Sequence, residues 1–309
     1  MPMHNNVCNI HIINQKKGLL RQAMNLIKQV TNDIRQGLIS EYFKYLLAFA
    51  VMIFLSLSFV MSVKNGVSVN RIDTSSISIT DIFMNFFKGM KPYDPNSNSQ
   101  FDMPTAYILL NVLLAFIIGN YPMNDLLGFG KNVLVRSRDR ASWWISKCIW
   151  NVISVIVFYS ILFIIILITC AVFGKISFEP TVSICSKITG IDITQKTTYV
   201  DIGMLLFTLY FIPIVTSLAL SMFQMTMAFI TSPIISYTFI IAILVGGAFY
   251  DNPFVPGNYF MLIRNEILLK GGYHTFAAIF EDCVIFIVSV LAGYIYFKKF
   301  DIIEKHDLL

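Results

Sequence analysis

The 309-residue chain is 56% hydrophobic and only 13% charged, with a mean hydropathy of +0.68. This composition excludes an ordinary soluble domain, because the apolar residues come in blocks of about 20, the length that crosses a bilayer core. The formal net charge of +5 is modest and predicts no nucleic-acid partner. The five cysteines have no paired spacing, so they indicate neither a disulfide framework nor a zinc site.

The first predicted element is an amphipathic helix over residues 19–39. Apolar side chains recur there at steps of three and four and so share one helical face: Leu19, Ala23, Leu26, Ile27, Val30, Ile34 and Leu38. Basic residues lie elsewhere on the helix, which favours a position in the inner membrane interface. Packing on a soluble partner is the alternative, and the two interpretations are compatible.

Six apolar segments follow and are predicted to span the membrane, at about residues 45–63, 104–121, 143–173, 202–224, 234–250 and 276–297. The third is about 31 residues long, or about 45 Å as a helix, so it must tilt or protrude from the bilayer. Pro213 lies near the centre of the fourth and favours a kink there. The predicted fold is an all-α polytopic membrane protein with one transmembrane domain over residues 1–309.

The outer segments are 64–103, 174–201 and 251–273. In the first of them, five apolar side chains share one helical face: Ile82, Phe83, Phe86, Phe87 and Met90. This pattern predicts a short helix that rests on the outer leaflet or caps the spans. A short helix is also predicted over Asn258–Leu269, where Arg264, Glu266 and Lys270 exclude a normal span. We therefore expect short outer or re-entrant helices between the fifth and sixth spans.

The segment 122–147, between the second and third spans, carries five basic residues: Lys131, Arg136, Arg138, Arg140 and Lys147. Because short cationic loops stay in the cytoplasm, both termini are predicted to be cytoplasmic, in a plasma-membrane protein. Trp143 and Trp144 follow the charges, where amphipathic rings would sit at headgroup level. Glycines among apolar residues suggest a short broken helix under the bilayer, and a plain topogenic loop is the alternative.

The motifs of several enzyme and metal-site classes are missing from the sequence. It contains no GxxxxGK[ST], GxSxG or HExxH motif, and its four histidines are scattered. We therefore expect no cofactor, metal or enzymatic activity in this chain.

Glu281 and Asp282 are the acids nearest to the hydrophobic layer. An intramembrane carboxylate would be a candidate proton or cation site. The favoured interpretation is that the sixth span begins after them and leaves both at the outer interface. Polar residues within the predicted spans are Asn111, Asn151, Ser154, Ser217, Ser221 and Gln224. Their default role is hydrogen bonding between helices, and lining a substrate path is the sharper alternative.

The order of these parts resembles the integral-membrane permease subunit of type-two ATP-binding-cassette exporters. The local match begins at Asp125 and Gly128 and continues through residues 133–135, the basic run 136–138 and the Trp143–Trp144 pair. The Ser-Pro-Ile-Ile-Ser run at 232–236 is also similar to the family. The 40-residue outer loop after the first span is longer than in compact members, which leaves the subclass open.

By this resemblance, segment 122–140 is a coupling loop that docks a cytoplasmic ATPase. The docking residues it implies are Asp125, Leu126, Leu127, Gly128, Phe129, Lys131, Arg136 and Arg138. Two ATPase subunits would bind ATP and Mg. A second permease copy or a paralogue would complete the transport pathway across the membrane lipid. The cargo would be amphipathic or apolar: a peptide, drug or lipid.

Three other interpretations stay open on the sequence. A secondary transporter or channel would need a charged site in mid-membrane, for which only Glu281 and Asp282 are candidates. An intramembrane enzyme would need paired catalytic groups within spans, and the sequence offers none. A sensor or immunity module with an ATPase partner would share the exporter fold.

Overall fold

The computed structural model describes residues 23–70, 74–91, 103–128, 130–132, 134, 139–186, 202–269 and 271–299, with the backbone alone for 66–70 and 74. Helices make up most of this part of the chain, and it contains no β-strand. One isolated bridge joins Asn265 and Tyr273. The predicted all-α class is therefore confirmed.

Five helical stretches are long and apolar enough to cross a membrane. They are α2 (Tyr42–Asn70), α4 with α5 (Thr105–Gly119 and Tyr121–Leu127), α7 (Arg140–Phe173), α9 (Ile202–Ile230) and α11 (Thr275–Lys299). A sixth apolar helix, α10 (Pro233–Phe249), is shorter. This is the architecture of a membrane-embedded helical protein.

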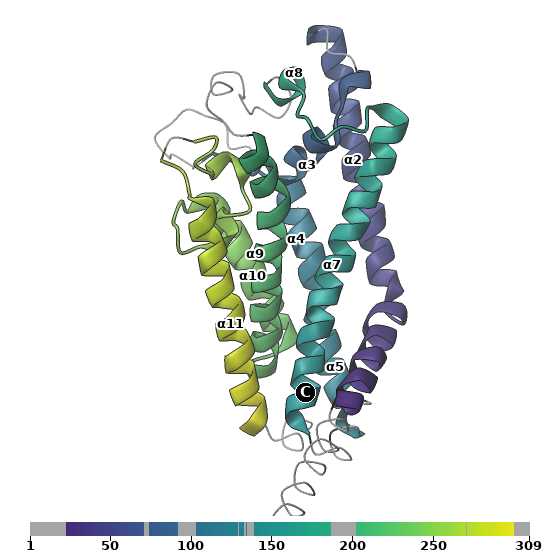
Figure 1. The fold of residues 1–309 in the computed structure, drawn as a ribbon, viewed down its shortest axis with the longest axis vertical. Helices are drawn as coiled ribbons and strands as arrows, with labels where there is room; N and C mark the ends of the chain where they lie inside the picture. Colours follow the sequence, from purple (N-terminus) through teal and green to yellow (C-terminus); the bar gives the residue numbers. More distant parts are fainter. Residues whose placement is uncertain are drawn as a thin grey trace, which may run out of the picture.

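The long helices run side by side along the longest axis of the molecule (Figure 1). One end holds α5, the first turn of α7 and the last turn of α11, and we call it the α5 end (Figure 1). The opposite end holds α3 (Ile79–Phe87) and α8 (Val182–Ile184), and we call it the α3 end. Most observed helices extend beyond the predicted spans, because hydropathy marks the thickness of the apolar layer rather than the end of helical hydrogen bonding.

Local sequence signals set several of the helix starts. The Ser78 hydroxyl accepts from the backbone N–H of Asp81, and the Asp81 carboxylate accepts from that of Ser78, which is a capping box at the start of α3. Asp139 caps α7 by accepting from the backbone N–H of Ser142. Ser232 caps α10, and Pro233 occupies its first turn.

The N-terminal stretch packs on the helical body. Residues 23–34 are α-helical and Arg35–Ile39 form a π-turn, after which α2 continues in one bent column (Figure 1). Gly37 is buried where a Cβ atom would overlap the indole of Trp150 on α7. The predicted helix at 19–39 is thus helical over its described part and contacts α7, and its position in a membrane interface stays a prediction.

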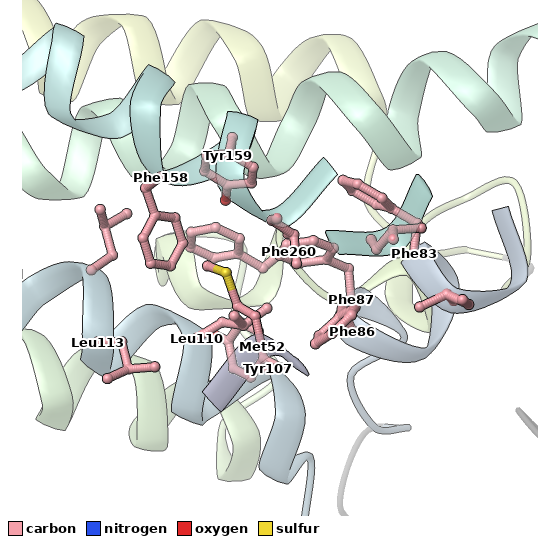
Figure 2. Packing of buried hydrophobic residues seen from close by; sticks show 14 of the residues in the cluster. Met52, Phe83, Phe86, Phe87, Tyr107, Leu110, Leu113, Phe158, Tyr159 and Phe260 are labelled. Carbon is pink, nitrogen blue, oxygen red and sulfur yellow. The ribbon is translucent and has the colours of Figure 1, made fainter. Parts of the chain in front are cut away.

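The largest hydrophobic cluster lies between α2, α4, α7, α9 and α10 and is closed at the α3 end by α3. Figure 2 shows Met52, Tyr107, Phe158 and Phe87 of these helices meeting there, together with Phe260 from the segment between α10 and α11. Eight of the nine residues of α3 are buried, so this helix caps the bundle. The capping alternative for residues 82–90 is confirmed.

The predicted short helix at Asn258–Leu269 is wrong. The structure has two 3-10 turns instead, Pro256–Asn258 and Leu262–Arg264. The physical reason is Arg264, which is 1% exposed and donates to the backbone carbonyls of Met90, Lys91, Gly247 and Ala248 and to the Asn258 side chain. The N–H donors of a guanidinium all lie in one plane, so the acceptors have to converge on that plane. An irregular backbone meets this requirement here.

Candidate functional site

The α5 end is built around an interruption of the helix after α4. Helix α4 ends at Gly119, Asn120 interrupts the helix, and α5 runs only from Tyr121 to Leu127. Gly128 ends α5 by donating its backbone N–H to the carbonyls of Asn124 and Asp125. A short helix of this kind lies where the sequence predicts a broken helix in segment 122–140.

A buried charge cluster connects α5 to the rest of this end, and we define it as Asp33, Asp125 and Lys147. The Lys147 Nζ lies 2.5 Å from Asp33 Oδ1 and 2.6 Å from Asp125 Oδ2. The Lys147 side chain is fully buried, and both carboxylates are more than nine-tenths buried. One ammonium on α7 therefore ties the N-terminal helix and α5 to the same point.

Aromatic rings complete the surroundings of the ammonium. The Lys147 Nζ lies 4.8 Å from the ring centroid of Tyr121 and 4.9 Å from that of Trp143, within cation–π range. The Tyr121 hydroxyl donates to Asp33 Oδ1 at 3.0 Å. The cluster is therefore closed by protein groups on several sides, which strengthens each electrostatic interaction in it.

The cluster carries one more negative charge than positive charge when both acids are ionised. Burial raises the pKa of Asp33 above its ordinary value of 3.8, the Asp125 charge raises it further, and the Lys147 ammonium opposes both effects. Among the described residues, Asp33 Oδ2 and Asp125 Oδ1 have no hydrogen-bond partner. The arrangement can therefore hold one proton or one further cationic group.

A cavity of about 300 Å³ adjoins the cluster. Its lining comes from the N-terminal helix, α5, the start of α7 and Gly130. A Cβ atom at position 130 would overlap Asp125 Oδ2, so glycine lets the backbone approach the carboxylate closely. The cavity and the cluster thus form one site at the α5 end.

The paired tryptophans lie inside the protein. Trp143 and Trp144 are 2% and 1% exposed and pack on Phe229 of α9 and Phe297 of α11. Trp144 also donates its indole N–H to the Val290 carbonyl at 3.0 Å. Both indoles therefore fill the space between three helices and do not form an exposed belt, and their position at headgroup level stays a prediction.

Two residues of the predicted cationic loop are likewise used internally. Lys147 is in the charge cluster, and Arg140 donates to the backbone carbonyls of Phe297 and Lys298 at 3.2 and 2.8 Å. A cation at these terminal carbonyls stabilises the C-terminal turn of α11. Their charges therefore join helices, and their role in membrane topology stays a prediction.

The structure divides the predicted docking residues into three groups. Asp125 and Leu126 are buried in this chain, the first in the charge cluster and the second against Trp143 and its neighbours, so neither offers its side chain to a partner. Leu127 and Lys131 are half-buried and Gly128 is exposed. Phe129, Arg136 and Arg138 lie outside the described residues.

The polar residues predicted as pathway candidates are all buried, and most take part in hydrogen bonds between or within helices. Ser221 donates to Asn151 Oδ1 at 2.7 Å, Gln224 donates to the Ala115 carbonyl at 2.9 Å, and the Ser217 and Tyr159 hydroxyls lie 2.8 Å apart. Asn111 bonds to the Tyr107 carbonyl in its own helix. Asn151 Nδ2 lacks a partner in the described part of the chain, and Ser154 interacts with Tyr45 of α2.

Asp282 lies within α11, not before it. Its carboxylate is fully buried and accepts from the Thr216 hydroxyl of α9 at 2.6 Å. The sequence favoured a span that begins after Glu281 and Asp282. Helix α11 starts at Thr275 and contains both acids, and their depth in the membrane stays a prediction. The described residues give Asp282 no ion-pair partner, and they contain no group of His, Cys, Asp and Glu that could hold a metal ion.

A family model described as "Protein of unknown function (DUF2705)" matches residues 74–303. The chain belongs to this family. The DUF2705 region takes in α5, Asp125 and Lys147, whereas Asp33 precedes it. No curated protein and no solved structure matches the chain.

The roles of Asp33 and Lys147 were missed in the sequence. The available signal was Lys147 itself, which lies four residues inside the predicted span at 143–173. A cation within a span needs a buried partner. The sequence gives no spacing that would pair Lys147 with Asp33, 114 positions earlier, or with Asp125, 22 positions earlier.

Proposed function

We propose that this DUF2705 protein is the membrane-spanning permease subunit of an ATP-driven exporter. In this proposal a separate cytoplasmic ATPase docks at the α5 end, binds ATP and Mg, and drives the outward release of an amphipathic or apolar cargo. Two ATPase subunits and a second permease copy or paralogue complete the assembly. In this proposal the protein lies in the plasma membrane and its α5 end faces the cytoplasm.

The observation that supports this proposal best is the connection of α5 through the charge cluster. A short helix at the end of the bundle is useful for coupling only if a push on it reaches the spans. Asp125 on α5 is held by Lys147 on α7, and the same ammonium holds Asp33 on the N-terminal helix. Displacement of α5 must therefore move these elements together or break a buried ion pair, which costs several kcal/mol.

The arrangement of helices fits six crossings. The start of α2 and the end of α11 lie at the α5 end (Figure 1), as an even number of passes requires. Helix α10 has 17 residues, about 25 Å at 1.5 Å per residue, which is near the lower limit for a span. We include α10 as the fifth of six spans.

The proposed mechanism is an equilibrium between two arrangements of the helices. ATP-dependent closure of the ATPase pair has to stabilise one arrangement more than the other, since a ligand shifts an equilibrium only by its differential affinity. Asn124, Gly128 and Asn132 are exposed at this end, and Leu127 and Lys131 are half-buried. These residues are the surface through which the described part of the loop would meet the ATPase.

The test is co-purification from cells that express the chain with the ATPase from its genomic neighbourhood. Leu127→Asp and Lys131→Glu should each reduce the recovered ATPase at least tenfold. The matched control is Val182→Asp, which places the same acid on a 41% exposed apolar residue of α8 at the opposite end. Retention of the ATPase by both α5-end variants would refute docking at this surface.

Asp282 supports a second candidate, a secondary transporter that works alone. A buried carboxylate in an apolar helix is a candidate proton or cation site. It lies about 10 Å along α11 from the first residue of the helix, estimated from the helical rise. In vesicles that hold the purified chain alone, gradient-driven uptake that Asp282→Asn abolishes would favour this candidate over the exporter subunit.

A further inference from the structure

The cavity at the α5 end has a lining that is not satisfied by the protein alone. Asp33 and Asp125 line it, are 3% and 7% exposed, and each carries one carboxylate oxygen that no other described residue contacts by a hydrogen bond. Gln29 also lines the cavity, and its Oε1 atom is buried without a partner. Three unpartnered acceptors from two elements therefore belong to residues that line one half-open cavity.

Trp143 adds a donor to the same lining. Its indole is 2% exposed, and the Nε1 atom has no acceptor within the described part of the chain. Buried polar atoms without partners cost free energy, so such groups normally meet a ligand, an ion or ordered water. Four of them around one cavity indicate an occupant rather than four separate defects.

The charges indicate which occupant fits. Within the charge cluster the Lys147 ammonium neutralises one of the two carboxylates, so one excess negative charge remains beside the cavity. A metal ion of charge two would find too few oxygens and too little negative charge here. A singly charged group with several N–H donors matches three acceptors and one excess charge.

We infer that this cavity is a binding site for a small organic cation with a primary ammonium or guanidinium group. The N–H groups of the ligand donate to Asp33, Asp125 and Gln29. The aromatic rings around Lys147 shield these contacts from water. A volume of about 300 Å³ is at the lower limit of small-ligand pockets, which restricts the ligand to a small molecule. Because it contacts the N-terminal helix, α5 and α7 together, the ligand would stabilise their present arrangement.

The inference does not depend on the proposed exporter function, since it concerns the purified chain without an ATPase. The chain has three tryptophans, Trp143, Trp144 and Trp150, and all lie on α7. Indole fluorescence in detergent micelles therefore reports on the site. The probes are methylguanidinium and ethylammonium chloride, with tetramethylammonium chloride and KCl as comparisons at constant ionic strength.

We expect methylguanidinium and ethylammonium to produce a saturable change in fluorescence and a higher midpoint of thermal unfolding. Tetramethylammonium has the charge but no N–H donor, and it should bind at least tenfold more weakly, as should K⁺. Asp125→Asn should weaken binding at least tenfold while leaving Lys147 paired with Asp33. Gln29→Leu removes an acceptor without changing charge and should weaken binding severalfold.

Lys28 gives a test of whether the ligand of this cavity is a cation or an anion. It lines the cavity and is exposed to solvent, so its ammonium repels a bound cation. Lys28→Gln should therefore tighten methylguanidinium binding severalfold. The matched control is Lys44→Gln, which removes a lysine from the start of α2 that pairs with Glu41 and does not line the cavity. This control should bind as the unaltered protein does.

Four results would overturn the inference. They are no saturable binding of either N–H cation, equal binding of K⁺ and methylguanidinium, unchanged binding in both Asp125→Asn and Gln29→Leu, and weaker binding in Lys28→Gln. Equal binding of K⁺ and methylguanidinium would indicate a site for an inorganic cation. Weaker binding in Lys28→Gln would indicate a site for an anion. If Asp125→Asn does not fold, Gln29→Leu and Lys28→Gln, which keep the charge cluster, decide the question.

Discussion

Replacement of Lys147 by methionine should destabilise the protein strongly while keeping the volume of the side chain. The variant removes the ammonium from between Asp33 Oδ1 and Asp125 Oδ2, which it holds at 2.5 and 2.6 Å. These two distances place the oxygens at most about 5 Å apart, where two negative charges repel by roughly 3 kcal/mol or more at an effective dielectric constant of about 20. Breaking a buried ion pair in this way typically costs about 3–5 kcal/mol.

The measurement is thermal unfolding in detergent, followed by the tryptophan fluorescence of α7. A loss of about 3–5 kcal/mol should lower the midpoint by roughly 6–20 °C for a protein of this size class. The control is the triple variant Asp33→Asn, Lys147→Met, Asp125→Asn, which removes all three charges and should recover most of the loss. An unchanged midpoint in Lys147→Met, or a triple variant no more stable than the single one, would refute the reasoning.

Three further predictions concern other parts of the structure. Burial raises the pKa of Asp33 above 3.8, so the folded state keeps a proton that the unfolded state releases. Stability should therefore fall as pH rises from about 4 through the folded-state pKa, and Asp33→Asn should flatten this slope in urea unfolding measured at a series of pH values. Gly293→Ala should cost about 1–3 kcal/mol, because its Cβ atom would overlap the Trp144 ring, and a midpoint equal to that of the unaltered protein would contradict this packing. Arg264→Lys should leave most of the buried carbonyls around Arg264 without donors, so hydrogen exchange should speed up in residues 247–265 while α7 stays protected.

Much of the fold could be predicted from the sequence because hydropathy and capping are local signals. Apolar blocks of membrane length located the long helices, and the face shared by Phe83, Phe86 and Phe87 located α3 and its buried side. A short broken helix was also predicted in segment 122–147, where glycines interrupt apolar residues, and α5 lies there with Gly128 at its end. These features depend on neighbours within a few positions along the chain.

The rest could not be predicted, because it depends on contacts between distant segments. Asp33 pairs with a residue 114 positions away, and Arg264 reaches carbonyls at positions 90 and 91. Counting charges along the sequence placed Lys147 in a solvated loop, whereas helical packing buries it in the structure. In the same way, a pair of tryptophans after basic residues is typical of a membrane interface, and only the packing of α9 and α11 shows that they are enclosed.

The central claim is that an external ATPase acts on the membrane body through α5. The most direct measurement is photocrosslinking from position 124, where Asn124 is exposed on α5 and a photoreactive residue does not disturb the charge cluster. The account predicts a crosslink, in intact cells, to a cytoplasmic protein with a phosphate-binding loop, and its yield should change when ATP is depleted. Modification of position 124 by a membrane-impermeant reagent added outside the cells would contradict the account.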